Sequence, residues 1–140
     1  MDEQRKKSLS NLFQSISALE RTAANGWNSR NSLGISKSHI QILQLLATEG
    51  PVRPSFIADK LQVTSGGVTV LTTKLIKSGY IERTQHEMDK RAAQITITEE
   101  GLNVLSASKR QIASFTEHLF GDLTTEEIEI LHKLFMKCIK

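Results

Sequence analysis

The segment from Val63 to Thr98 constrains the fold of this chain more than any other part of its sequence. An apolar helical pattern opens at Thr64 and ends at Gly79, and two β-rich runs follow at residues 80–83 and 94–98. Thr64 is a favourable N-cap, and Gly79 can adopt the left-handed conformation that terminates a helix. The segment therefore predicts a helix followed by an antiparallel hairpin. A charged loop forms the predicted tip of this hairpin: His86-Glu87-Met88-Asp89-Lys90-Arg91.

Two shorter helices are predicted just before this segment. Ser36 suits the N-cap of the first, which stops at Gly50-Pro51. Pro54 suits the first turn of the second, where its fixed φ and its missing N–H are tolerated. Each helix has an apolar side, formed by Ile40, Leu43, Leu46 and Ala47 in the first and by Ile57 and Leu61 in the second. Together with the third helix and the hairpin, they predict a winged helix-turn-helix.

Both ends of the chain carry further helical patterns. The first pattern ends at Asn25-Gly26 before a predicted loop over residues 28–34, and its apolar stripe is Leu9, Leu12, Phe13, Ile16, Leu19 and Ala23. After the hairpin, a helix from residue 98 to about residue 120 repeats leucine or isoleucine at heptad spacing, at Leu105, Ile112 and Leu119. Thr124 and Glu127 form a capping box for the last helix. The apolar side of that helix is Ile128, Leu131, Leu134, Phe135 and Ile139.

The predicted fold class is mainly α with a small β-hairpin wing. Its parts are an N-terminal dimerisation helix and loop (1–35), a winged helix-turn-helix DNA-binding region (36–98) and C-terminal dimerisation helices (99–140), all in one compact unit. The terminal helices bury their apolar sides most economically against each other and against a second copy of the chain. A homodimer would also place two recognition helices about 34–36 Å apart, which is the spacing of successive turns of double-stranded DNA.

Composition limits the class of protein. With 140 residues, of which 39% are hydrophobic and 24% charged, the chain is typical of a small soluble protein. No apolar run is long enough to cross a membrane, and the charged first ten residues do not fit a signal peptide. A single cysteine, Cys138, excludes an internal disulfide framework. We therefore expect a cytoplasmic protein with no membrane partner.

The distribution of charge favours a polyanionic partner. The net charge is +3, and residues 53–91 hold seven lysines or arginines against four acids, while the rest of the chain balances at eleven against eleven. The whole positive excess therefore lies on residues 53–91, from the start of the second helix to the tip of the hairpin, where an interface for DNA phosphates would need it. Three charges over this length also fit chance, so charge alone does not decide.

Several short segments of the chain match one known family in order and spacing. They are Pro54-Ser55-Phe56-Ile57-Ala58-Asp59-Lys60-Leu61, Val63-Thr64-Ser65-Gly66-Gly67-Val68-Thr69, Gly79-Tyr80-Ile81-Glu82-Arg83, Asp89-Lys90-Arg91-Ala92 and Ile97-Thr98-Glu99-Glu100-Gly101. In these segments the chain resembles the MarR family of bacterial transcriptional regulators. The resemblance implies an obligate dimer that binds a pseudo-palindromic operator, often answers to a small-molecule effector and needs no cofactor.

The resemblance also assigns site residues. The third helix becomes the recognition helix for the major groove, with Thr64, Ser65, Gly66, Gly67, Thr69, Val70, Thr73, Lys74 and Lys77 as the predicted DNA-binding residues. Arg91, with Lys90, would enter the adjacent minor groove, and Asp89 would orient the arginine through a charge-assisted hydrogen bond. Independently of the family, hydroxyls and the N–H groups of a helix N-terminus suit phosphate.

Two features of the recognition helix need separate comment. Val70 stands where relatives often carry arginine, so a bidentate arginine–guanine contact is missing there. A valine packs instead on a thymine methyl, which favours an A·T-rich site. Gly66-Gly67 would let the backbone approach DNA closely, but glycine is equally well explained by tolerance in the first turn of a helix.

Other residues have structural explanations beside functional ones. Phe13, Trp27 and His39 are candidates for a ligand pocket, because ligand sites of the family lie between the dimerisation helices and the DNA-binding core. Ordinary core packing with a surface histidine explains the same residues. The four histidines lack the spacing of metal ligands. Cys138 is expected to pack as a small hydrophobic residue on the apolar side of the last helix.

These observations predict a dimeric, sequence-specific DNA-binding regulator, most simply a ligand-responsive repressor that occupies promoter DNA. We do not expect an enzyme, because the chain has no Gly-rich phosphate loop and no nucleophile motif. Two alternatives stay open. One is a winged-helix module that binds protein and uses its basic hairpin only for solubility, and the other is a thiol-based redox regulator that acts through Cys138.

Overall fold

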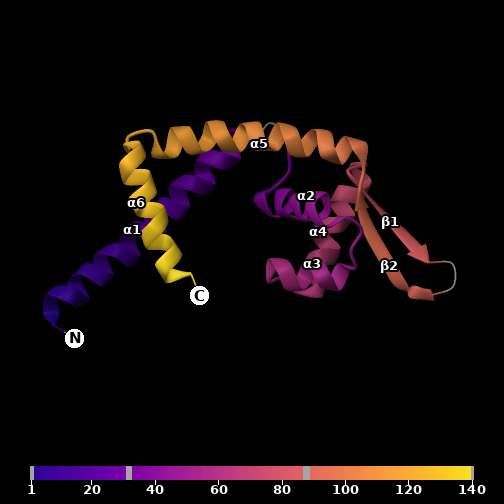
Figure 1. The fold of residues 1–140 in the computed structure, drawn as a ribbon, viewed down its shortest axis with the longest axis horizontal. Coiled ribbons are helices and arrows are strands. Elements are labelled where there is room, and N and C mark those ends of the chain that lie inside the picture. Colours follow the sequence, from indigo (N-terminus) through magenta and orange to yellow (C-terminus); the bar gives the residue numbers. More distant parts are fainter. Residues whose placement is uncertain (1, 31–32, 87–88, 140) are drawn as a thin grey trace. The chain divides into compact units, whose positions relative to one another are not determined.

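The computed structural model describes the backbone of residues 2–30, 33–86 and 89–139, and the side chains of these residues except 30, 86 and 89–92. Its elements are α1 (Glu3–Arg30), α2 (Lys37–Glu49), α3 (Pro54–Leu61), α4 (Ser65–Lys77), β1 (Ile81–His86), β2 (Asp89–Ile97), α5 (Glu99–Phe120) and α6 (Thr125–Cys138) (Figure 1). The predicted fold class is confirmed. The chain divides into two compact units, residues 32–110 and residues 1–31 with 111–140. The division falls within α5, whereas the sequence placed all of α5 with the C-terminal dimerisation helices.

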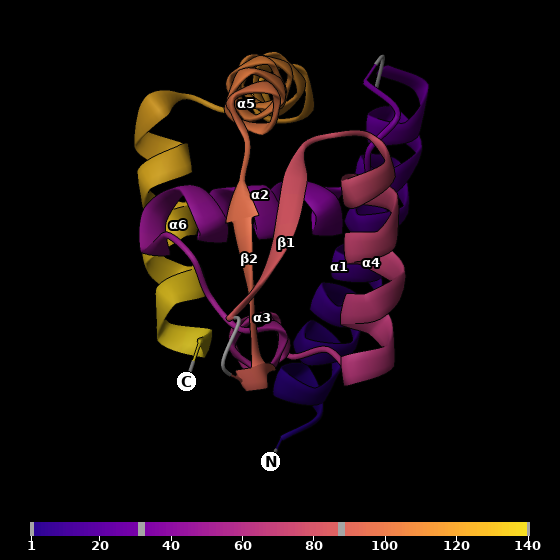
Figure 2. The same ribbon diagram turned by 90° about the vertical axis from the view of Figure 1, so that its right-hand side faces the viewer.

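The unit formed by residues 32–110 is a winged helix-turn-helix. Helix α4 contacts α3 and β1, while α2 contacts β2 and both of the other helices. Figure 2 shows α4 running alongside β1, with α2 passing behind the hairpin. Every one of these elements contributes aliphatic side chains to a core that excludes solvent: Ile42, Leu43, Leu46, Ile57, Val68, Leu75, Ile81 and Ile95.

Local sequence signals set the ends of α2 and α4 as predicted. The Ser36 hydroxyl accepts a hydrogen bond from the His39 backbone N–H at 3.3 Å, which caps α2. The Thr64 hydroxyl does the same for the Gly67 N–H at 3.0 Å, at the start of α4. Gly79 has a φ of 80° just after α4, a conformation that favours glycine because a Cβ is strained there.

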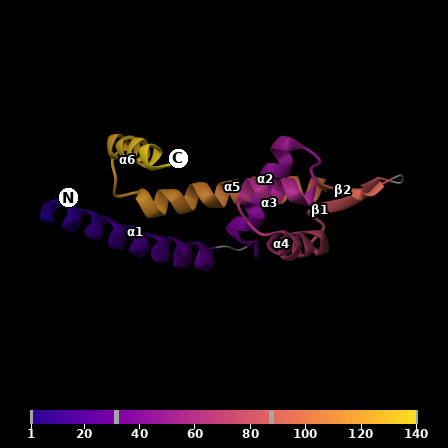
Figure 3. The same ribbon diagram turned by 90° about the horizontal axis from the view of Figure 1, so that it is seen from below.

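Strands β1 and β2 pair antiparallel, with Ile81 opposite Ile97. The register shifts between Thr84 and His86, and pairing then resumes with His86 opposite Asp89. Both strands therefore extend into the predicted charged loop, and that prediction was wrong in its bounds. The predicted strand bounds depended on an alternation of apolar and polar residues. Such alternation appears only where one face of the strand is buried, so the sequence did not reveal the outer parts of these strands. The hairpin projects beyond α2, α3 and α4 (Figure 3).

A backbone bridge ties the hairpin to the start of α3. The Val52 N–H donates to the Ile95 carbonyl at 3.2 Å, and the Ile95 N–H donates to the Val52 carbonyl at 2.8 Å. Ile95 is fully buried, so this bridge satisfies backbone groups that water cannot reach. This bridge was not predicted, because a single bridging residue produces no periodic pattern in the sequence.

The junction between β2 and α5 explains the Thr-Glu-Glu-Gly motif. The Thr98 hydroxyl donates to the Gly79 carbonyl at 2.6 Å and accepts from the Gly101 N–H at 3.0 Å. It thus caps α5 and fastens that helix to the end of α4. A Cβ added at Gly101 would overlap the Tyr80 carbonyl oxygen and would lie 2.7 Å from Cγ1 of Ile97. The glycine is therefore needed for space.

In the unit formed by residues 1–31 and 111–140, α1 continues through Asn25 and Gly26 to Arg30. The prediction that Asn25-Gly26 ends this helix was wrong. Trp27 is only 5% exposed, and its ring meets Phe115 edge-on, with centroids 5.7 Å apart and planes at 77°. A Cβ at Gly26 would lie 3.0 Å from the Phe115 ring. The glycine allows this contact, which outweighs its low helix propensity.

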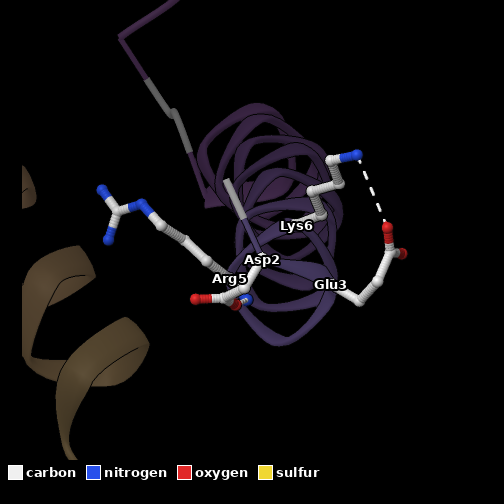
Figure 4. Close-up of polar contacts among 4 residues, drawn as sticks. All are labelled: Asp2, Glu3, Arg5 and Lys6. Carbon is white, nitrogen blue, oxygen red and sulfur yellow. Dashed lines mark hydrogen bonds and ion pairs between the residues drawn. The ribbon is translucent and has the colours of Figure 1, made fainter.

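The N-terminus of α1 is held by short-range polar contacts (Figure 4). The Asp2 carboxylate accepts a hydrogen bond from the Arg5 backbone N–H at 2.6 Å, as an N-cap does. The Lys6 ammonium lies 3.5 Å from a Glu3 carboxylate oxygen, one helical turn away. Both side chains of this ion pair are largely exposed, so it adds little to stability.

Helix α6 begins with the predicted capping box. The Thr124 hydroxyl accepts from the Glu127 N–H at 3.1 Å, and the Glu127 carboxylate accepts from the Thr124 N–H at 2.9 Å. These hydrogen bonds to Thr124 lower the pKa of Glu127 below its ordinary value of 4.5. All 14 residues of α6 are described and none is buried. Cys138 is exposed in the single chain, where packing was expected.

Candidate nucleic-acid interface

Helix α4 has one buried side and one exposed side, as a recognition helix requires. Val68, Thr72 and Leu75 face the core, each no more than 5% exposed. The predicted contact residues of the other side are exposed: Thr64, Ser65, Gly66, Thr69, Val70, Thr73, Lys74 and Lys77. Gly67 is half-buried. The structure therefore brings the helix residues predicted from the sequence onto one continuous face.

The first turn of α4 leaves its backbone accessible. A Cβ at Gly66 would meet nothing closer than the Thr64 hydroxyl at 3.9 Å, so the position is open. A Cβ at Gly67 would lie 3.3 Å from that hydroxyl, so glycine there also fits the cap closely. The exposed N–H groups of a helix N-terminus attract phosphate, and a turn without side chains lets a phosphate approach.

The threonine hydroxyls of α4 are engaged by the helix itself. Thr69 donates to the Ser65 carbonyl at 3.1 Å, and Thr73 donates to the Thr69 carbonyl at 2.7 Å. A hydroxyl has one proton, so these two side chains are left with acceptor lone pairs and a methyl group for any ligand. Their chemistry toward DNA is therefore narrower than their residue type suggests.

Lys74 makes a contact that the sequence did not predict. Its ammonium donates to the Gly34 carbonyl at 2.7 Å, 40 residues earlier in the chain. Gly34 has a φ of 73°, which turns the chain before α2 and places this carbonyl. Lys74 is thus hydrogen-bonded to the turn before α2, although both it and Lys77 are exposed. In the sequence, the only signal at this position is the glycine itself, which tolerates a positive φ.

The wing residues Asp89, Lys90 and Arg91 lie on the first three positions of β2. Their side chains lie outside the described residues, so their roles stay predictions. The backbone alone places them beside the tip of the hairpin, since His86 pairs with Asp89. A basic hairpin end next to a recognition helix suits a minor groove beside a major groove.

The three residues predicted for a ligand pocket have different surroundings. Phe13 is 72% exposed on α1, Trp27 is buried against Phe115, and His39 is 7% exposed in the capping box of α2. His39 belongs to the other compact unit from Phe13 and Trp27. Their joint role in a pocket stays a prediction.

His39 replaces the glutamate or glutamine that usually completes a capping box. Its Nδ1 accepts a hydrogen bond from the Ser36 N–H at 3.0 Å, which requires that nitrogen to be unprotonated. Burial lowers the pKa of His39 below its ordinary value of 6.5, and the positive charge of Lys74 lowers it further. The unfolded chain therefore binds a proton more readily than the folded chain does.

We expect the free energy of unfolding to fall as pH decreases through 6.5, because protonation then favours the unfolded chain. His39→Gln keeps a capping residue and removes the titration, so this variant should lose less stability on acidification. Urea unfolding of both proteins at about pH 7.5 and about pH 5.5 measures the difference. His132→Gln, at an exposed histidine, serves as the control and should behave like the parent. Equal losses in all three proteins would exclude His39 as the source.

Metal-binding clusters are absent from the part of the chain that the structure describes, where no three His, Cys, Asp or Glu side chains are grouped suitably. Among the described helices, none combines the length and the apolar character needed to span a bilayer. The exposed face of α4 and the hairpin beside it have the arrangement that defines the class of winged helix-turn-helix DNA-binding proteins.

Comparison with known proteins gives the family. A sequence profile of the MarR family matches residues 35–93. An uncharacterised helix-turn-helix-type transcriptional regulator of Bacillus cereus is 32% identical over 107 residues, covering 76% of this chain and 71% of the relative. The chain belongs to the MarR family of transcriptional regulators.

One further sequence relative and two solved structures are similar to this chain. The transcriptional regulator PapX of Escherichia coli is 32% identical over 108 residues, and the match covers 76% of this chain but only 66% of PapX. A mutant MarR from Escherichia coli, solved in complex with operator DNA, has a TM-score of 0.81 at 20% identity and full coverage of both chains. PcaV of Streptomyces coelicolor, solved with its natural ligand, has a TM-score of 0.76 at 17% identity, covering 88% of this chain and 87% of PcaV.

Proposed function

We propose that this protein is a sequence-specific DNA-binding transcriptional regulator that binds a near-palindromic operator as a homodimer. The observation that carries the proposal is the free face of α4, whose opposite side is anchored in the core by Val68, Thr72 and Leu75. Membership in the MarR family supports this role, and a MarR protein of the same fold has been solved with operator DNA. Occupation of promoter DNA would make the protein a repressor.

The terminal helices support the dimer. In the single chain, α1 exposes Leu12 at 57% and Phe13 at 72%, and α6 exposes Ile130 at 57% and Leu134 at 52%. Ile139, the residue after α6, is 66% exposed. Apolar surface of this extent is typical of an interface. A second copy of the chain has the same surface, and a twofold dimer would pair the two copies of each helix. The dimer would present two α4 helices to the two halves of the operator.

Regulation by a small molecule is the remaining part of the proposal. PcaV, which shares this fold, has been solved with its natural ligand. In this chain, Phe13, Trp27 and His39 are each individual candidates for contact with an effector. A bound effector would change the spacing of the two recognition helices and thereby release the operator.

Arg91→Ala tests the wing. Removal of a minor-groove arginine should weaken binding of selected operator DNA about tenfold and reduce the salt slope by about 0.9 for each phosphate that this side chain neutralises in the parent protein. Fluorescence anisotropy titrations over a range of salt concentrations measure both quantities. Arg21→Ala, which removes an exposed arginine of α1, is the control and should leave both unchanged. An Arg91→Ala variant with parental affinity and slope would remove the wing from the mechanism.

A further inference from the structure

We propose that α4 recognises its half-site through thymine methyl groups, with Val70 as the specificity-determining residue. The inference rests on the proposed DNA-binding function and deepens it by naming the chemistry that is read. Three observations support it: the exposure of Val70, the engagement of the neighbouring hydroxyls, and the absence of long donor side chains from the first turns of α4.

Val70 is exposed to an extent that packing within its own unit does not explain. Its side chain is 71% exposed, compared with 46% for Leu102, 40% for Ile76 and 37% for Val63, the other exposed large hydrophobic residues described between residues 33 and 110. Val68, two positions earlier, is 2% exposed. An isopropyl group held out from a well-anchored helix gains free energy when an apolar surface covers it.

The groups around Val70 offer few hydrogen-bond donors. From Ser65 to Thr73 the sequence holds no arginine, lysine, asparagine or glutamine. The hydroxyls of Thr69 and Thr73 donate to carbonyls of α4 itself. The ammonium of Lys74, the next residue, directs one of its three N–H groups to the Gly34 carbonyl. From Thr69 to Thr73, the exposed side chains of α4 therefore present methyl groups and acceptor lone pairs.

Each base pair offers different groups in the major groove. Guanine offers two acceptors, which are usually read by arginine or lysine, whereas thymine offers a 5-methyl group for apolar contact. Covering guanine acceptors with an isopropyl group would remove their water without replacing its hydrogen bonds, and this is costly. A thymine methyl against Val70 carries no such cost. The site opposite Val70 is therefore expected to be an A·T pair with its thymine toward the helix.

The experiment begins with the full-length protein and operator DNA selected from genomic fragments. Each thymine of the half-site is replaced, symmetrically in both halves, by deoxyuridine, which lacks only the 5-methyl group. One buried methyl contributes about a fourfold change in affinity, so removing the methyl from both half-sites should weaken binding of the dimer about fifteenfold. We expect this decrease at one symmetric thymine position for the parent protein.

Val70→Ala removes the partner of that methyl. The variant should bind thymine and uracil operators equally, while its melting temperature stays close to that of the parent, because the Val70 side chain is 71% exposed. Val63→Ala is the matched control, since it truncates another exposed valine next to α4. It should keep the preference of the parent for thymine. The double-mutant cycle between protein and DNA isolates the contact from general effects on affinity.

Three outcomes overturn the inference. Operator binding that is insensitive to every thymine-to-uracil change would exclude methyl recognition and leave the DNA-binding function standing. A Val70→Ala variant that still prefers thymine at the same position would assign the contact to another residue. A protein that shows no sequence-dependent binding to any genomic fragment would remove the proposed function and this inference together.

Discussion

Leu134→Glu is expected to convert the proposed dimer into monomers and to weaken operator binding by two orders of magnitude or more. Leu134 lines a surface hollow of about 390 Å³ on α6 with Ile130 and Leu131, and it is 52% exposed in the single chain. A carboxylate in this apolar contact would be desolvated without a partner. A monomer that binds one half-site loses the effective concentration that joins the two halves, which is worth about 10²–10⁴ in affinity.

Sedimentation and anisotropy at the same protein concentration would check both parts of this prediction. Lys133→Glu is the matched control, because it introduces the same carboxylate at the neighbouring exposed position with a larger change in net charge. It should remain dimeric and bind DNA. A dimeric Leu134→Glu variant would exclude this part of α6 from the interface. A monomeric variant with parental affinity would show that one copy of the chain suffices for DNA recognition.

Gly101→Ala is expected to lower the free energy of unfolding by about 2 kcal/mol, the middle of the range for overpacked sites. The added Cβ would overlap the Tyr80 carbonyl oxygen, and a backbone atom in a tight junction cannot move aside as a side chain can. Helix propensity favours alanine by about 1 kcal/mol, so the steric cost must exceed that gain. The Thr98 hydroxyl is hydrogen-bonded to both Gly79 and Gly101 at this junction. A displacement of Gly101 should therefore also weaken the attachment of the hairpin to α5.

Gly66→Ala is the matched control for this change. A Cβ at Gly66 has open space around it, so the same substitution should be neutral or slightly stabilising. Urea unfolding of the two variants and the parent measures the effect. A Gly101→Ala variant as stable as Gly66→Ala would contradict the close packing of α5 on the end of α4.

Most of the winged-helix unit could be predicted because its signals act over a few residues. The caps at Ser36 and Thr64 and the stop at Gly79 each depend on groups within one helical turn. The exposed face of α4 followed in the same way, since burial of Val68 and Leu75 leaves the opposite side to solvent. The length of the hairpin could not be predicted from the sequence, because exposed strands pair through backbone hydrogen bonds and need no apolar pattern.

Within the candidate site, the sequence predicted which residues are exposed on α4, but it did not predict the hydrogen-bond partners of their side chains. Lys74 was assigned to DNA as an exposed cation, but the structure gives its ammonium a carbonyl partner in the turn before α2. The hydroxyls of Thr69 and Thr73 were expected to face a ligand, and they donate to their own helix. Side-chain hydrogen bonds depend on rotamers and on distant backbone, which periodicity does not report.

The sequence by itself determined where the helices of the winged-helix unit begin and end, which side of α4 is free, and that a basic hairpin follows. Those features arise from capping, periodicity and turn chemistry, all of which act between near neighbours. Only the tertiary structure decided that α1 continues past Asn25-Gly26 and that α5 lies against the end of α4. In each case a glycine lets two distant segments meet, at Phe115 and at Tyr80, and the packing free energy of that contact outweighs the local preference of the chain.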